Sequence, residues 1–241
     1  MAEIRAIVGR LNPKAPKVEM GNGGLPELTA ADIAGALGMV KESLGREIFC
    51  ALWWPDGAKI AAAALDAALE AEQWRRFREL MDALVTAQIA VTHAEIELDG
   101  THGRTSTMHA QYGRAKGMLE EARSNMWPRI CPTYIALRRA VIEELKSPNL
   151  CKHCAGRGSV RIAERLIVCQ HCNGTAHKSA SYRDRAKAIG KERTQYFEGG
   201  WRRAYDWTFH RFATLENEAA KELRFRLFGG EWRRSFERVH A

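Results

Sequence analysis

The residues with the clearest chemistry are four cysteines arranged as two close pairs. Each pair has the form Cys-x-x-Cys, and 14 residues separate the two pairs. Two residues between paired cysteines let both thiolates of one tight turn reach the same metal ion, and a second such turn completes a tetrahedral site. The pattern predicts one structural Zn²⁺ ion, bound by Cys151, Cys154, Cys169 and Cys172.

The residues around the cysteines favour a compact metal-binding module. Glycines follow each pair, which suits a backbone with positive φ and amide groups open toward the sulfurs. Apolar residues alternate between Ser159 and Val168 and predict a small two-stranded hairpin. Because four thiolates saturate zinc, we expect His153 and His171 to be exposed neighbours rather than ligands. With no open coordination position left for catalysis, the ion is expected to stabilise the fold.

The remaining cysteines and the composition are typical of a soluble protein. Cys50 and Cys131 stand alone, which favours metal binding over a disulfide framework, and Cys50 lies in an apolar run typical of a buried thiol. No apolar run approaches the ~20 residues needed to cross a bilayer, and the N-terminus lacks the pattern of a signal peptide. We therefore expect a cytoplasmic protein without a membrane partner. Because the sequence has no phosphate loop, nucleophile elbow or His-Glu-x-x-His helix, we do not expect an enzyme.

Positive charge is concentrated in the second part of the chain. The net charge is +8, but residues 29–150 contain 14 basic and 16 acidic residues. Residues 151–172 contain 4 basic residues and 1 acidic residue, and residues 173–241 contain 15 and 9. This division favours a basic half that faces nucleic acid and a more neutral helical half. A basic surface that is merely well solvated explains the counts equally well.

Four segments are expected along the chain, in a mainly α fold. Residues 1–28 contain several prolines and glycines and predict a flexible arm. Residues 29–150 predict a helical domain, residues 151–176 the zinc-binding module, and residues 177–241 a basic helical segment that binds DNA. The expected fold is a helical bundle followed by a small Cys₄ zinc module with a short β-hairpin and a helix-turn-helix-like helical segment.

Apolar residues at helical spacing define the expected helices. One helix begins at Thr29, a good N-cap, and ends at Gly45 or at the Trp54-Pro55 step. An alanine-rich stretch over residues 56–97 predicts one long helix or two, with one apolar face formed by Leu65, Leu69, Trp74, Phe77, Leu80, Met81, Leu84 and Ile89. Further helices are expected over residues 105–126, from residue 133 to a break at 147–149, and over residues 203–228.

Residues 179–201 carry a helix-turn-helix pattern. The small Ala186 lets two helices approach, Gly190 makes the turn, and a second helix begins near Glu192. Its first residues would meet base edges, and nearby basic residues would suit phosphates. An ordinary helical hairpin packed on the zinc module is the alternative, and Gly199-Gly200 would weaken or bend a recognition helix. The candidate DNA-binding residues are Arg193, Thr194 and Gln195 for bases, Lys191, Arg202 and Arg203 for phosphates, and Arg183.

The order of three motifs resembles the lambda-type antitermination protein Q of lambdoid phages. The strongest part is the paired Cys-x-x-Cys-x-Gly-x-Gly unit, followed directly by Ser179-Ala180-Ser181-Tyr182-Arg183. The other parts are residues 28–39, with Phe49-Cys50-Ala51 soon after, and the Pro-Lys spacing of residues 12–17. The chain departs from the family at Ala176, where the second unit usually ends in glycine, over residues 56–130, and beyond Leu215.

This resemblance implies a phage late-gene transcription antitermination factor. Such proteins bind promoter DNA near a late promoter and load onto host RNA polymerase, through its β-subunit flap and sigma factor. They then suppress pausing and termination, and remodelling of the RNA exit channel is a physical route to that effect. The resemblance also implies nascent RNA and host elongation factors as further partners, in the host bacterial cytoplasm.

Two other functions fit parts of the pattern. A zinc-containing DNA-binding regulator that acts only at initiation would carry the same zinc and helix-turn-helix features. A co-chaperone is the third candidate, because the zinc modules of DnaJ-type chaperones share the Cys-x-x-Cys-x-Gly-x-Gly unit. Those modules resemble four tandem copies that bind two metals, whereas this chain has two copies and no His-Pro-Asp tripeptide.

Overall fold

The computed structural model describes residues 2–9, 30–100, 105–146, 149–162 and 165–228. In this part the protein is mainly helical, as the sequence predicts, with one antiparallel two-stranded sheet. The helices are α1 (Ala2–Gly9), α2 (Ala30–Met39), α3 (Leu44–Trp53), α4 (Ala62–Gly100), α5 (Ser106–Asn125), α6 (Thr133–Leu145), α7 (Tyr182–Ala188), α8 (Arg193–Glu198) and α9 (Trp201–Phe228), with a 3-10 turn η1 (Pro55–Gly57) and strands β1 (Ser159–Ile162) and β2 (Arg165–Val168).

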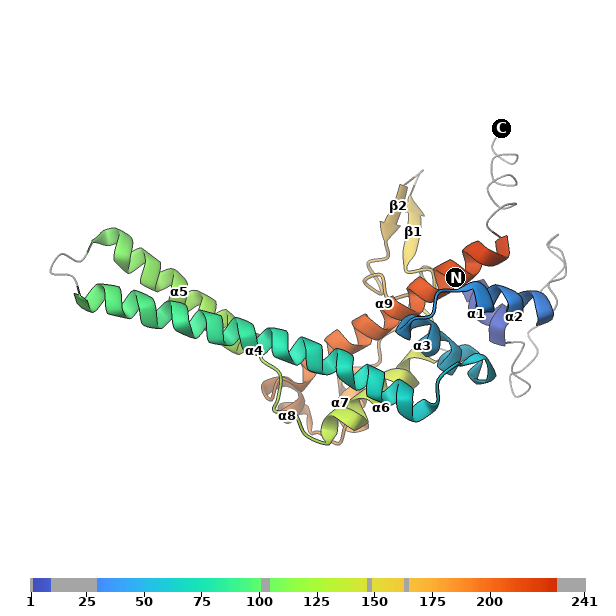
Figure 1. Cartoon of the computed structure of the whole chain (residues 1–241), viewed down its shortest axis with the longest axis horizontal. Coiled ribbons are helices and arrows are strands. Elements are labelled where there is room, and N and C mark those ends of the chain that lie inside the picture. The colour runs from blue at the N-terminus through green and yellow to red at the C-terminus, as the bar shows by residue number, and fades with distance from the viewer. Residues whose placement is uncertain (1, 10–29, 101–104, 147–148, 163–164, 229–241) are drawn as a thin grey trace.

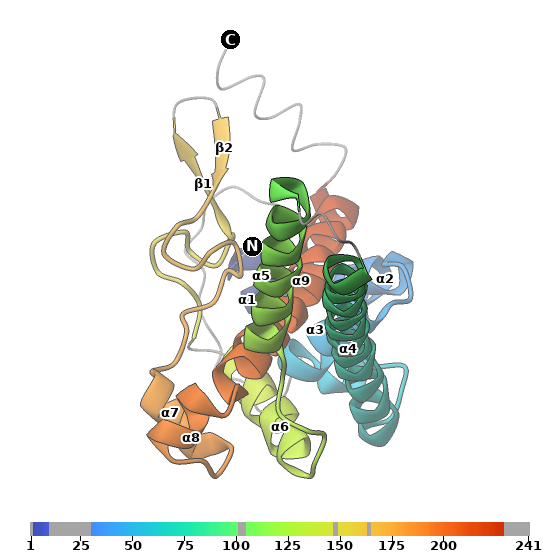
Figure 2. The same cartoon turned by 90° about the vertical axis from the view of Figure 1, so that its left-hand side faces the viewer.

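The molecule consists of a helical body and a long arm (Figure 1). Helices α4 and α5 form the arm, in which α4 continues beyond the body and α5 folds back along it. The body is built around α9, which contacts α1, α2, α3, α6, α7 and α8. In the end-on view of Figure 2, the β1–β2 hairpin stands away from the helices on the side where α7 and α8 lie. The arm and the hairpin therefore project from the body.

Helix α9 completes the core of the whole body. Its residues Tyr205, Phe209 and Phe212 are at most 1% exposed and pack in one cluster with residues of α3, α4 and α6. Nearer its end, Ala220 and Leu223 pack in a second cluster with α1, α2 and α3. The division expected at residue 177 therefore does not separate two cores, because the C-terminal helix supplies the surface on which the preceding helices are buried.

Residues 2–9 form α1, where the sequence predicts the start of a flexible arm. Ile4, Ile7 and Val8 recur at helical spacing and are buried against α2, α3 and α9. The predicted flexible N-terminal segment is wrong for residues 2–9, because burial of these apolar side chains favours an ordered helix. The prolines and glycines on which that prediction depended belong to residues 13–26. Residues 10–29, with the expected Thr29 cap, lie outside the described residues.

Two helices, α2 and α3, replace the single helix expected after Thr29. Residues 40–43 separate them, and the Ser43 hydroxyl caps α3 by accepting a hydrogen bond from the Arg46 N–H. Gly45 does not end a helix, since it lies inside α3 where a Cβ would overlap the Leu215 carbonyl of α9. It lets α3 and α9 approach closely. Helix α3 ends directly before Trp54-Pro55, the other expected break.

In the arm, α5 packs along one side of α4. The buried cluster between the two helices consists of Ala87, Val91, Ala115 and Leu119. Of the apolar face expected for this helix, Leu69 and Leu80 are buried, whereas Trp74, Met81 and Ile89 are exposed, so the prediction is wrong in part. The large apolar side chains of α4 that remain 37–64% exposed are Trp74, Met81, Val85, Ile89 and Ile96. Within the described ranges, no helix combines the length and apolar character needed to cross a membrane.

The remaining expected elements are confirmed with small shifts. The alanine-rich stretch forms one helix of 39 residues, α4, and α5 and α6 begin within one residue of their expected starts. Strands β1 and β2 pair in antiparallel register from Ser159↔Val168 to Ile162↔Arg165. Helix α9 begins two residues before the expected start at residue 203 and ends at Phe228 as expected.

Candidate metal centre and basic helical surface

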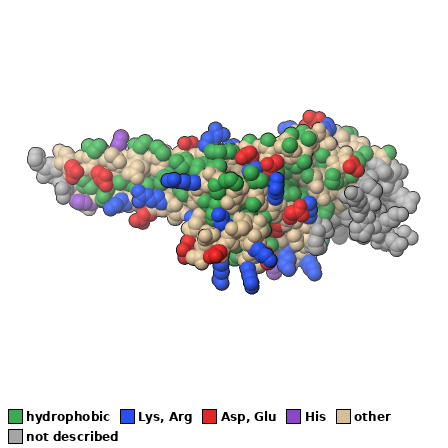
Figure 3. Space-filling view, turned by 90° about the horizontal axis from the view of Figure 1, so that it is seen from below, with side chains coloured by type: hydrophobic (Ala, Val, Ile, Leu, Met, Phe, Trp, Pro, Cys, Tyr) green, Lys and Arg blue, Asp and Glu red, His purple; other side chains and the backbone are tan. Residues whose placement is uncertain are grey.

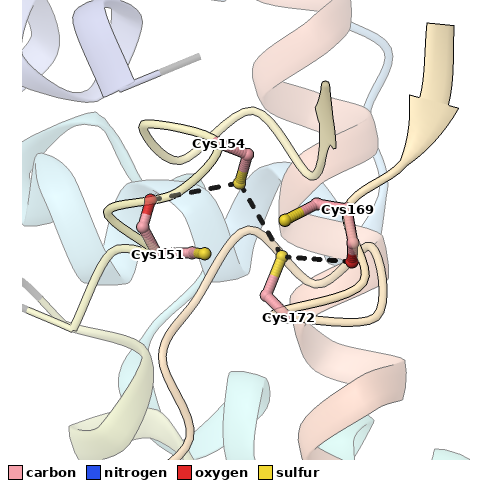
Figure 4. Close-up of side chains that lie close together, drawn as sticks. All are labelled: Cys151, Cys154, Cys169 and Cys172. Atoms are coloured by element: carbon pink, nitrogen blue, oxygen red, sulfur yellow. Dashed lines mark hydrogen bonds between the residues drawn. The ribbon is translucent and has the colours of Figure 1, made fainter. Parts of the chain in front are cut away.

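The four paired cysteines come together at the base of the β1–β2 hairpin. All four are buried, and their sulfur atoms lie within 4.8 Å of one another. Figure 4 shows the sulfurs directed toward a common centre between the two loops that carry them. The Cys154 and Cys172 sulfurs are 3.7 Å apart, close to the separation of roughly 3.8 Å for two sulfurs bound to a tetrahedral zinc ion. The four residues thus fit one metal ion.

The two cysteine loops repeat the same backbone bend. In each loop the glycine five residues after the first cysteine, Gly156 or Gly174, donates its N–H to that cysteine's carbonyl. Two residues further on, Gly158 has a φ of 75° and Ala176 a φ of 67°. The Gly158 N–H also donates to the Cys154 sulfur at 3.3 Å. Ala176 therefore adopts a left-handed conformation in the place that Gly158 occupies in the first loop.

Two of the four buried thiols, those of Cys154 and Cys172, resist ionisation unless a cation is present. Burial, together with the sulfurs of Cys169 and Cys154, raises the pKa of Cys172 to about 12. Burial likewise raises the pKa of Cys154. A divalent cation overcomes this effect because it binds the thiolate form directly. Four sulfur ligands leave no open position, so a metal bound here would contribute folding free energy rather than catalysis.

The other cysteines and the two nearby histidines lie outside the cluster. His153 and His171 are exposed, with ring centroids 4.0 Å apart, in the positions expected for neighbours of the site. Cys50 is fully buried, and that burial raises the pKa of its thiol to about 11. Cys131 is half-buried. The expected division into four clustered and two separate cysteines is therefore confirmed.

A buried ion pair fixes the cysteine loops to the helical body. Arg5 of α1 donates to the Gly156 carbonyl of the first loop at 2.8 Å and pairs with Glu216 of α9. Asn217, the next residue of α9, donates to the Thr175 carbonyl of the second loop at 2.7 Å. Each loop is thus held to the same stretch of α9. Sequence reasoning missed this link because Arg5 falls in the expected flexible arm.

The partners of Glu216 keep its carboxylate ionised although the side chain is buried. Burial raises the pKa of Glu216, but the Arg5 guanidinium and His177 lower that pKa to about 2. The His177 Nε2 atom lies 3.5 Å from a Glu216 carboxylate oxygen. The side chains of Arg5 and Glu216 are both wholly buried. Each charged side chain is therefore stable in the core only because the oppositely charged partner lies beside it.

Helices α7 and α8 form a helical pair directly after the cysteine loops. Ala186 is buried between them and their neighbours, and Gly190 has a φ of 66°, as the expected turn requires. Helix α8 has only 6 residues, ends at Glu198, and is followed by α9 from Trp201. The second helix expected to begin near Glu192 is therefore short, and Gly199-Gly200 separate it from the next helix.

The candidate DNA-binding residues of α7 and α8 are largely exposed. Arg183 lies on α7, and Arg193, Thr194 and Gln195 form the exposed first turn of α8. The Gln195 side chain also takes part in the cap of α8 by accepting from the Glu192 N–H. Figure 3, seen from the side on which α6, α7 and α8 lie, shows Lys and Arg side chains projecting along one edge. The first turn of α8 is thus free to meet a ligand.

The other three candidates lie where α8 meets α9. Arg202 and Arg203 are exposed, whereas Lys191 is half-buried with its ammonium 5.4 Å from the Trp201 ring. Arg202 and Arg193 both lie over the Phe197 ring, at 5.5 and 5.9 Å from its centroid. These contacts bring basic residues of α8 and α9 to one surface, although they come from different helices.

The contacts that position α7 involve residues that sequence reasoning did not single out. Arg185 of α7 is buried and donates to Glu144 of α6 at 2.7 Å and to Asp206 of α9 at 2.5 Å. The Tyr205 hydroxyl donates to the same Glu144 carboxylate at 2.9 Å. Nothing in the local spacing distinguishes Arg185 from the exposed Arg183. The distinction depends on which face of α7 packs against α6 and α9.

Comparison with protein-family models, with curated proteins and with solved structures found no match to this chain. The functional interpretation therefore depends on the geometry of the cysteine cluster and of the helices that follow it.

Proposed function

We propose that the protein is a phage late-gene transcription antitermination factor with one structural Zn²⁺ ion. It binds DNA near a late promoter, loads onto host RNA polymerase at the β-subunit flap and sigma factor, and suppresses pausing and termination. Remodelling of the RNA exit channel is the proposed route. The observation that carries the proposal is the buried four-cysteine cluster followed directly by a helical pair with exposed basic residues. The motif order described above supplies the link to antitermination.

The metal-binding module is proposed to join the bundle to the α7–α8 pair. It contacts α1 through Arg5 and α9 through Asn217, and His177 pairs with Leu150 five residues before α7 begins. A metal ion that orders these loops would therefore fix the point from which α7 begins. In this proposal the zinc positions α7, and the helices contact DNA.

DNA binding is proposed for the exposed residues of α7, α8 and the start of α9. Arg193, Thr194 and Gln195 are the candidates for base edges, while Arg202 and Arg203 suit phosphates. Helix α8 is too short to lie along a groove for several turns. The proposed mode is therefore insertion of its first turn, supported by phosphate contacts from the neighbouring helices.

The arm is proposed to face RNA polymerase. Its exposed apolar side chains include Val85, Ile89 and Ile96, which are 50–64% exposed. Large exposed apolar side chains grouped on one helix favour a protein-contact surface over a solvated one. At 39 residues, α4 is about 58 Å long, so the arm can reach a protein surface while the body remains on DNA.

Retention on transcribing polymerase tests this function. Polymerase is paused promoter-proximally on an immobilised template, the protein is added, and the complex is washed before and after transcription resumes. The proposal expects the protein to remain bound to polymerase after it leaves the promoter. A regulator that acts only at initiation would instead remain with promoter DNA. A co-chaperone would bind neither complex and would suppress the aggregation of an unfolded client.

A further inference from the structure

A pocket of about 470 Å³ lies where the arm joins the body. Its wall is formed by α4, the end of α5, α8, the first turns of α9, and Trp127. This volume falls within the range of roughly 300–1,000 Å³ that is typical of small-ligand sites. It differs from the first turn of α8 considered above, because its lining residues come from both the arm and the body.

The lining combines aromatic rings with arginines. Trp127, Phe197 and Trp207 contribute aromatic groups, and the two tryptophan rings are arranged edge to face with centroids 5.3 Å apart. The charged lining residues are Arg76, Arg202 and Arg203, against a single acidic residue, Asp206. Because Asp206 already pairs with Arg185 and Arg202, the pocket keeps an excess of positive charge.

One of these arginines has an unused donor. The Arg76 Nε–H is buried and has no hydrogen-bond acceptor among the residues that the structure describes. Its Nη1 atom is 3.0 Å from a Glu79 oxygen, in an ion pair that is partly exposed to solvent. Because the Nε–H is closed to solvent, an anionic ligand in the pocket would meet the Nη groups of Arg76, whose side chain is 35% exposed.

We infer that this pocket binds one unpaired nucleotide of a single-stranded nucleic acid. The base stacks against the aromatic wall and a flanking phosphate lies at the arginines, which is how proteins bind single strands in general. The inference rests on the proposed function and specifies one form of nucleic acid that the protein holds. It assigns ligand contact to Arg76, Phe197 and Trp207, which are not among the candidates from the sequence.

The pocket adjoins the exposed arginines of α7 and α8, and this position favours a nucleic acid over an acidic peptide as the ligand. Arg202 lines the pocket, lies over the Phe197 ring, and donates to the Tyr182 hydroxyl of α7 at 3.1 Å. A strand with one nucleotide in the pocket can therefore continue past α8 and α7, where Arg193 and Arg183 are exposed. An acidic peptide would use the arginines but would gain little from planar aromatic groups.

The matched pair Arg76→Gln and Arg75→Gln tests the phosphate contact. The two residues are adjacent on α4, both form surface ion pairs with Glu79, and only Arg76 lines the pocket. Binding of a short labelled oligothymidylate is measured by fluorescence anisotropy at several salt concentrations. We expect Arg76→Gln to weaken binding about tenfold and to reduce the slope of log K against log salt by about 0.7. Arg75→Gln should leave both unchanged.

A second matched pair tests the aromatic contact. Phe197→Leu removes a ring from the pocket but keeps apolar bulk, whereas Phe225→Leu changes an exposed phenylalanine on the distal part of α9. Loss of one stacked base contact should weaken oligothymidylate binding by about fivefold or more. The Phe225 variant should bind as the wild type does. Circular dichroism spectra that match the wild type would show that all four variants are folded.

The outcomes separate this inference from the proposed function. Equal binding by both members of each pair, or no binding of oligothymidylate by the wild-type protein, would overturn the inference. Tighter, Arg76-dependent binding of an oligoglutamate would overturn it in favour of an acidic peptide. Retention of the wild-type protein on transcribing polymerase is scored in a separate assay. The proposed function can therefore succeed there even where the pocket fails.

Discussion

At the residue scale, a buried charge pair connects the first cysteine loop to the bundle. Arg5 and Glu216 are both inaccessible to solvent, and Arg5 uses a further donor for the Gly156 carbonyl. Removing one partner of such a pair leaves an uncompensated buried charge, which is far more costly than the pair's net contribution suggests. The effect of a substitution here should therefore extend from the core to the cysteine loop.

Replacing Glu216 by glutamine should lower the free energy of unfolding by about 3–5 kcal/mol, because Arg5 is left buried without a counter-charge. Chemical denaturation monitored by circular dichroism measures this change. The Glu218→Gln variant provides the control, since Glu218 is exposed on the same helix. A loss as small as that of the control would show that Arg5 finds another partner.

The same residue predicts a pH dependence. The pKa of Glu216 is lowered from its ordinary value of 4.5 to about 2 in the folded protein. Because the folded state binds this proton less tightly than the unfolded state, the stabilisation is present above pH 4.5 and is lost as the pH falls toward 2. Thermal melts across this range should show a weaker acid dependence for Glu216→Gln than for the wild-type protein. Identical slopes would contradict the assigned pKa.

The two cysteine loops should respond differently to exchange of glycine and alanine. A Cβ at Gly158 would lie 2.5 Å from the Gly174 carbonyl oxygen, in addition to the strain of a positive φ. Gly158→Ala should therefore destabilise the module and weaken its affinity for zinc, as measured by competition with a coloured chelator. Ala176→Gly should change the free energy of unfolding by less than about 1 kcal/mol, because relief of strain offsets a lost buried methyl. Equal effects would refute the asymmetry.

At the element scale, α8 and the start of α9 have separate roles in the proposed DNA contact. Arg193→Ala should cost about 1–3 kcal/mol of binding free energy and relax sequence preference, since it removes a base contact. Arg202→Ala should weaken binding to all sequences similarly and flatten the salt dependence. Selection from a random DNA pool, followed by titration at several salt concentrations, measures both. An unchanged sequence preference for the Arg193 variant would exclude base contact by α8.

The elements could be predicted from the sequence wherever the signal was local. Alanine content and helical spacing were sufficient for α4, and alternating apolar residues were sufficient for β1 and β2. Gly45 was misinterpreted because a helix break and a close helix crossing both favour glycine. The exposed face of α4 and the buried Arg185 depend on which helices pack together, and no local spacing contains that information.

Some residues of the candidate sites could be identified from the sequence, whereas others are recognised only in the packed structure. The four cysteines could be identified from spacing alone, because metal geometry fixes the distance between paired ligands. The pocket residues Arg76, Trp127 and Phe197 come from separate helices and a loop, and only the packed structure brings them together. Composition did not distinguish these residues from ordinary core and surface residues.

At the scale of the whole molecule, the metal-binding module is attached to a bundle that has its own core. The cysteine cluster is separate from the two large apolar clusters. Loss of metal should therefore disorder the loops over residues 149–178 and release their contacts with Arg5 and Asn217, while the α9 core persists. The proposal therefore treats the module as a local folding unit that depends on a bound ion.

Cys169→Ser should abolish stoichiometric zinc binding and make the module sensitive to protease, because three thiolates no longer complete the tetrahedral site. Cys131→Ser is the matched control, since Cys131 lies outside the cluster. Metal analysis and limited proteolysis with mass mapping measure both effects. Cleavage spread through the bundle, or zinc retained by the Cys169 variant, would contradict a local metal-dependent unit.

The proposed antitermination function is tested most directly by the fraction of transcripts that extend past a terminator. A reconstituted reaction with host RNA polymerase is run from the protein's own late promoter, with the protein added once polymerase has paused near that promoter. The account predicts that wild-type protein raises terminator read-through well above the protein-free level, and that the Cys131→Ser variant does so equally. Read-through that stays at the protein-free level, with zinc-loaded protein bound to the template, would contradict it.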